Sequence, residues 1–155
     1  MKRANFITIP FKMEAHQGLS QVDGLAKISV AGIVLEFETK FLGLVNTGVK
    51  EVRLPLEEIT SIVFKKGFFR IGGKIEIRMS TFLKLSELPN KDGKIVLKIP
   101  RDQHADAKLA AELLTRHLNV YFDELPPPQM PVGDLFETDE LVSDDFETNK
   151  LNKPE

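Results

Sequence analysis

The stretch KIVLKIPRDQHADAKLAAELLTRHLNVY (94–121) changes its hydrophobic period once, at Pro100. Before that proline, Ile95, Leu97 and Ile99 alternate with polar residues, as in a β-strand that buries one face. After it, Asp102 is a candidate N-cap, and apolar residues recur three and four positions apart, which is typical of an amphipathic helix. These residues are Ala105, Leu109, Ala110, Leu113, Leu114, Leu118 and Tyr121. The stretch therefore predicts a last strand followed by one long helix.

Six earlier segments show the same two-residue alternation and predict further strands. They cover residues 7–13, 26–30, 33–41, 52–56, 59–64 and 75–79, with 83–85 as a further short candidate. Ala31 and Gly32 predict a tight turn between the second and third segments. Pro10 cannot donate a ladder hydrogen bond, which predicts an edge position for the first strand. The fold expected is mostly β, a curled antiparallel sheet of about seven strands capped by one C-terminal helix.

The length and composition of the chain fit one domain plus a short appendage. Its 155 residues are 42% hydrophobic and include no cysteine, which excludes disulfides, thiolate metal sites and a cysteine nucleophile. We expect a domain over residues 1–122 and a proline-rich, acidic, disordered tail over 123–155. The basic start Met1-Lys2-Arg3 precedes too short an apolar run for an export signal, and no stretch reaches the roughly 20 apolar residues of a membrane span. A cytoplasmic protein is expected.

Charge is divided unevenly between these two parts. The tail carries ten acidic residues against two lysines, a net charge of −8, so residues 1–122 carry +6 within a total of −2. A basic body favours anionic surfaces, and a tethered acidic tail competes for the same patch. The alternative is that both sets of charges only keep the protein soluble.

The tail repeats itself with a period of ten residues. DLFETDEL (134–141) is followed by DDFETNKL (144–151), so that Phe136 and Leu141 recur as Phe146 and Leu151. Spaced apolar anchors in an acidic segment predict a docking motif, and two copies raise its avidity. A chance echo in a low-complexity tail is the alternative. Docking is open both in cis, as autoinhibition, and in trans, to another protein.

A glycine-bounded loop combines basic and aromatic residues, a pattern that favours contact with acidic lipid at about 1 kcal/mol for each charge. Its candidate binding residues are Lys65, Lys66, Phe68, Phe69, Arg70 and Lys74. The alternative places both phenylalanines in the core or at its rim.

No pattern predicts an enzyme, a cofactor, a metal or a small-molecule substrate. His16, His104 and His117 are scattered, no serine lies in a nucleophile elbow, and Gly72-Gly73-Lys74 is not a phosphate loop. One tyrosine and no tryptophan argue against nucleic acid. A cyclic-dinucleotide receptor of the PilZ type is disfavoured too, because Lys27 stands where that motif has an acidic or amide residue.

The stretch from Gly24 to Tyr121 resembles pleckstrin-homology-like domains, especially the bacterial PH-like and GRAM-like domains. The resemblance lies in GLAKISVAG (24–32), VRLPLEEI (52–59), GFFRIGGK (67–74) and the terminal helix. It implies a curled seven-stranded sheet with one helix, and binding rather than catalysis. Lipid-reading members have a long first loop beside basic residues. Here the tight Ala31-Gly32 turn stands in that place, followed by Glu36 and Glu38, so phosphoinositide recognition is not carried over.

The function expected is therefore a non-enzymatic module for protein–protein interaction, which includes self-assembly into a homo-oligomer, with the tail as a second contact element. The alternative is a peripheral module at the inner membrane surface that contacts acidic lipid through the loop from Lys65 to Lys74.

Overall fold

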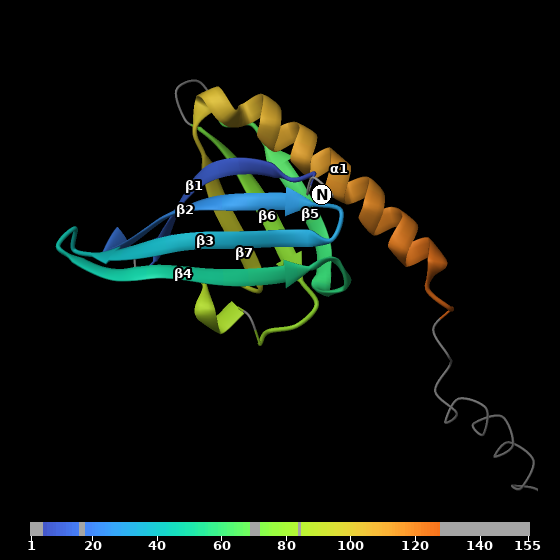
Figure 1. The fold of residues 1–155 in the computed structure, drawn as a ribbon, viewed down its shortest axis with the longest axis horizontal. Coiled ribbons are helices and arrows are strands. Elements are labelled where there is room, and N and C mark those ends of the chain that lie inside the picture. The colour runs from blue at the N-terminus through green and yellow to red at the C-terminus, as the bar shows by residue number, and fades with distance from the viewer. Residues whose placement is uncertain (1–4, 16–17, 69–71, 84, 128–155) are drawn as a thin grey trace, which may run out of the picture. The chain divides into compact units, whose positions relative to one another are not determined.

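Seven antiparallel strands form a curled half-barrel, followed by one helix (Figure 1). This computed structural model describes residues 5–15, 18–68, 72–83 and 85–127. The elements are β1 (Ile7–Ala15), β2 (Ser20–Ser29), β3 (Gly32–Phe41), β4 (Val45–Pro55), β5 (Ile59–Lys65), β6 (Gly73–Met79), β7 (Lys94–Ile99) and α1 (His104–Glu124). The predicted fold class is confirmed. Residues 83–85 form no strand among the described positions, since Leu85–Glu87 is a 3₁₀ turn.

The sheet order is β4-β3-β2-β1-β7-β6-β5, so the edge strands are β4 and β5. The prediction that Pro10 marks an edge strand is wrong, because β1 lies between β2 and β7. Pro10 is tolerated there for a physical reason: β1 pairs with β2 over its whole length but meets β7 only at Lys12 and Lys98. A residue without an N–H group costs little where two strands separate.

The tight turn at Val30 and Ala31 joins β2 to β3, and Gly32 is the first residue of β3. It is the second connection of the sheet and not the first, because β1 precedes β2. On β2 the residues that alternate with buried ones are Gln21, Asp23, Leu25 and Lys27, which contain no pair of basic residues. Glu36 on β3 forms an ion pair with Lys27.

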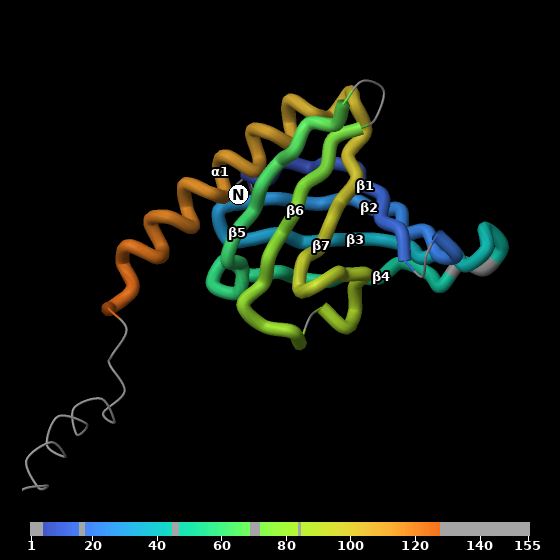
Figure 2. The backbone as a smooth tube through the Cα atoms, turned by 180° about the vertical axis from the view of Figure 1, so that it is seen from behind, coloured from blue at the N-terminus to red at the C-terminus, as the bar shows by residue number. Residues whose placement is uncertain are grey.

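Helix α1 packs mainly beside β5, as the view in Figure 2 shows. Its buried residues are Ala107, Ala110, Ala111, Leu114 and Leu118, whereas the predicted core residue Leu109 is exposed. Small alanines on the buried face let the helix approach the sheet closely, which turns Leu109 outward. A 3₁₀ turn, Arg101–Gln103, precedes the helix, so Asp102 lies within this turn, one residue before the N-cap position of α1.

Candidate functional site

A groove runs between the edge strand β5 and helix α1, with a volume of about 880 Å³. Ile62 and Ala111 are buried at its base, while Val63 is exposed beside them. The groove is lined by Ile62, Val63, Phe64, Lys66, Lys108, Ala111, Glu112, Thr115 and Arg116. An edge strand beside an apolar helix face is an arrangement that accepts extended peptides.

The edge of β5 that does not pair with β6 faces this groove. The hydroxyl of Thr115 has two carbonyl oxygens within hydrogen-bond distance, that of Ala111 at 2.7 Å and that of Ile62 at 3.3 Å. The Ile62 carbonyl therefore points away from β6 and toward the helix. In an antiparallel ladder, one residue directs its N–H and C=O to the same side, and the side alternates along the strand. Phe64, two residues after Ile62, therefore presents both backbone groups at the open edge.

Contacts around Phe64 hold this part of the groove in place. Its ring meets the His104 imidazole edge to face, with the ring centres 5.4 Å apart. His104 Nε2 in turn accepts a hydrogen bond from the backbone N–H of Gly73 at 2.5 Å. The start of β6 and the start of α1 are thereby tied together beside Phe64.

The rim of the groove is mostly basic. Lys66, Lys108 and Arg116 line it together with one carboxylate, that of Glu112. Glu112 Oε1 lies 3.9 Å from Lys108 Nζ in an exposed i,i+4 pair. Such a pair is worth only about 0.3–0.5 kcal/mol, so it holds neither side chain firmly. The four charges sum to +2, which favours an acidic ligand over a basic one.

The residues of the predicted lipid-binding loop lie in different surroundings. Lys65 Nζ lies 2.8 Å from Glu76 Oε2, and Lys74 Nζ lies 3.0 Å from Glu76 Oε1. Lys66 lies in the groove, and Phe68 is 78% exposed. The remaining predicted residues of the loop and the tail lie outside the described residues: Phe69, Arg70, Phe136, Leu141, Phe146 and Leu151. The basic loop is thus only partly available to a ligand.

Glu76 is the centre of a cluster of lysines on the outer face of the sheet. Lys94 Nζ makes a third, longer contact of 3.7 Å with its carboxylate. Hydrogen bonds from Lys65 and Lys74 lower the pKa of Glu76 to about 2, although burial opposes this shift. The cluster is a structural element, because the Glu76 carboxylate ties together lysines from three strands, β5, β6 and β7.

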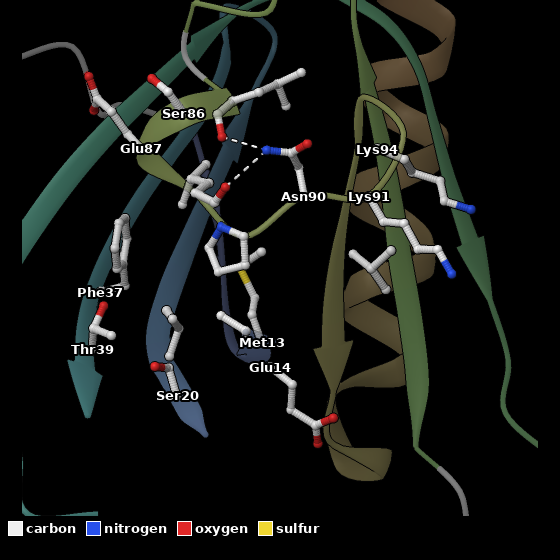
Figure 3. A pocket seen from close by; sticks show the side chains of 16 residues that line it. Met13, Glu14, Ser20, Phe37, Thr39, Ser86, Glu87, Asn90, Lys91 and Lys94 are labelled. Carbon is white, nitrogen blue, oxygen red and sulfur yellow. Dashed lines mark hydrogen bonds between the residues drawn. The ribbon is translucent and has the colours of Figure 1, made fainter. Parts of the chain in front are cut away.

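A second hollow, of about 570 Å³, opens where β1 and β7 separate (Figure 3). Met13, Val22, Phe37, Leu85 and Leu88 give it buried apolar walls. The Asn90 side-chain amide donates to the carbonyls of Leu85 at 2.6 Å and Leu88 at 3.2 Å, which fixes the segment on one side. Acidic and basic side chains both line the hollow, so its charge favours neither an acidic nor a basic ligand.

The groove residues on the helix were not recognised as a site in the sequence. Lys108 and Arg116 are eight residues apart, which only indicates that they share the solvent face of a helix. That β5 is an edge strand and that α1 lies beside it are properties of the sheet order. No local signal in the sequence reports that order.

No family model matches this chain, and no curated protein matches its sequence. Across the described ranges, no group of three or more histidine, aspartate or glutamate side chains is placed to hold a metal ion. No helix in the same ranges is long and apolar enough to cross a membrane.

Proposed function

We propose that this chain is a non-enzymatic, PH-like module that binds an extended acidic segment of a protein in the groove between β5 and α1. The curled half-barrel with its C-terminal helix is compatible with a PH-like fold. The observation that carries the proposal is the open backbone edge at Phe64 beside a basic rim.

The groove supplies two kinds of contact to such a segment. A strand added to β5 pairs with the backbone of Phe64, which gives affinity without regard to sequence. Lys66, Lys108 and Arg116 select acidic side chains, and exposed Val63 offers apolar contact. Main-chain pairing and charge together define the ligand as an acidic peptide with apolar anchors.

The tail repeats have this composition, which links the two proposed contact elements. DLFETDEL and DDFETNKL combine carboxylates with Phe136, Leu141, Phe146 and Leu151. In the proposal, the tail of one copy docks on a second copy or on another protein with a similar groove. Such exchange between copies produces a homo-oligomer.

A labelled peptide of residues 133–152 is expected to bind the full chain, with an affinity that falls as NaCl is raised from about 50 to 300 mM. The double variant Lys108→Glu with Arg116→Glu reverses the rim charge and is expected to weaken binding at least about tenfold. Fluorescence anisotropy measures the affinity. Hydrogen exchange of the Phe64 amide should slow when the peptide is bound.

The matched control is Lys50→Glu with Arg53→Glu, which makes the same charge change on β4, at the other edge of the sheet. Its peptide affinity should stay within about threefold of the wild-type value. Equal losses in the two double variants would mean that net charge alone attracts the peptide, and the groove would then have no part in recognition. Light-scattering mass of the full chain and of a version ending at Phe122 tests the self-assembly part.

Peripheral binding of acidic lipid through the loop from Lys65 to Lys74 is the second candidate function. The exposure of Phe68 favours it. The ion pairs of Lys65 and Lys74 with Glu76 weaken it, because both ammonium groups are held at the Glu76 carboxylate, which offsets one of their two charges. Phe68→Ala with Phe69→Ala should reduce binding to acidic vesicles if this loop makes the contact.

A further inference from the structure

The hairpin between β3 and β4 projects beyond the rest of the sheet, far from the part of α1 that packs on β5 (Figures 1 and 2). Its sequence is KFLGLVNTGVK (40–50), in which two lysines bracket nine uncharged residues. Leu42 is 59%, Leu44 89% and Val49 71% exposed, and Phe41 beside them is also exposed. A concentration of aliphatic side chains on a projecting tip marks an interaction surface.

The polar backbone of this tip is largely hydrogen-bonded within the protein. Phe41 pairs with Val45 across the hairpin, and the N–H of Leu44 donates to the carbonyl of Phe41 at 3.1 Å. The N–H of Leu42 donates to the carbonyl of Leu19 at 3.0 Å, which brings a further exposed leucine to the base of the tip. Backbone groups that are hydrogen-bonded within the protein lower the free-energy cost of moving the tip from water into lipid.

We propose that this tip inserts into the interfacial region of a bilayer that contains anionic lipid. The aliphatic side chains would enter the boundary between headgroups and acyl chains, while Lys40 and Lys50 at its base contact lipid phosphates. Lys40 lies at the base of the tip, where its Nζ is also 3.5 Å from Asp23 Oδ2.

A lipid surface fits the tip better than a protein surface for two reasons. First, the tip projects with exposed aliphatic side chains and has no aromatic or charged residue between Leu42 and Val49. The residues that contribute most of the binding energy in protein–protein interfaces are instead rich in Trp, Tyr and Arg. Second, apolar residues at the end and lysines at the base match the depth profile of a bilayer surface. The site is separate from the β5–α1 groove and does not depend on peptide binding.

Tryptophan fluorescence tests insertion directly, because the chain contains no tryptophan. In the full-length variant Leu44→Trp, vesicles of phosphatidylcholine and phosphatidylglycerol at about 3:1 should shift the emission maximum to shorter wavelength. The matched control is Val30→Trp, at the exposed turn before β3 and therefore at the opposite end of that strand. It should show no shift. The absence of a shift in Leu44→Trp, or equal shifts in both variants, would overturn the proposal.

Vesicle sedimentation provides the second readout. Leu42→Ser with Leu44→Ser should lower the partition coefficient of the full chain at least about tenfold, because two leucines no longer leave water. Phe82→Ser with Leu83→Ser removes two equally exposed apolar residues elsewhere and should leave binding unchanged. Peptide affinity of the groove should be the same in both variants. Unchanged sedimentation of the tip variant, or a fall in its light-scattering mass that reveals a contact between copies, would contradict lipid insertion.

Discussion

Replacing Glu76 by glutamine is expected to lower the free energy of unfolding at pH 7 by about 2–3 kcal/mol. The pKa of Glu76 falls from 4.5 to about 2 in the folded protein, which sets an upper bound of about 3.5 kcal/mol, because one pKa unit corresponds to about 1.4 kcal/mol. The expected loss is smaller, because water screens the half-exposed ammonium groups of Lys65 and Lys74. Glutamine keeps the shape of the side chain but leaves Lys65 and Lys74 facing a neutral group. Urea unfolding of the two proteins measures the difference.

The effect should depend on pH in a defined direction. A carboxyl group whose pKa is lowered by folding stabilises the folded state fully above its unfolded pKa. The contribution of Glu76 is therefore complete above pH 4.5 and is lost as the pH falls toward 2. The stability difference between the wild type and Glu76→Gln should be constant near neutrality and shrink across that range.

Glu51→Gln is the control for Glu76→Gln. Glu51 Oε1 lies 2.6 Å from Arg53 Nε, so this pair is as short as those of Glu76, but both side chains are well exposed. Exposed pairs contribute about 0–1 kcal/mol, because water screens the charges. A loss in Glu76→Gln no larger than that in Glu51→Gln would show that the lysine cluster does not stabilise the fold.

The Glu76 cluster shows what alternation in a sequence can and cannot predict. Alternation correctly placed Ile75 and Ile77 in the core and Glu76 on the other face of β6, where Glu76 is nevertheless buried. It could not predict that Lys65 and Lys74 meet the Glu76 carboxylate, because that contact depends on the register of β5 against β6, in which Lys65 pairs with Lys74 and Val63 with Glu76. Two residues assigned to a lipid-binding loop are for this reason part of a structural cluster.

The groove was missed for a related reason. The period of the helix was predicted correctly, but its buried face was placed over Leu109 rather than Ala107. Hydrophobicity alone favours leucine over alanine, whereas the packing distance of α1 against the sheet favours the smaller residue. Lys108 and Arg116 become groove residues only once α1 lies beside the β5 edge.

Gly32→Ala is expected to be a strongly destabilising substitution, with a loss of about 3 kcal/mol or more. Gly32 has a φ of +133°, a conformation that side-chain-bearing residues rarely adopt. A Cβ atom there would clash with the carbonyl oxygen of Leu54, in the paired strand β4. Since that neighbour is backbone, relief requires separation of β3 from β4. Thermal and urea unfolding measure the loss.

Gly43→Ala separates the two causes of this effect. Gly43 also has a positive φ, +71°, but a Cβ atom there would meet nothing within 4 Å. Backbone conformation alone should cost about 1–2 kcal/mol, so Gly43→Ala should lose about half as much as Gly32→Ala, or less. Equal losses would mean that β4 moves aside at little cost and that close backbone approach does not fix this turn. The larger loss at Gly32 would instead show that the start of the β3–β4 pairing depends on a residue without a side chain, because only glycine fits between the turn and Leu54.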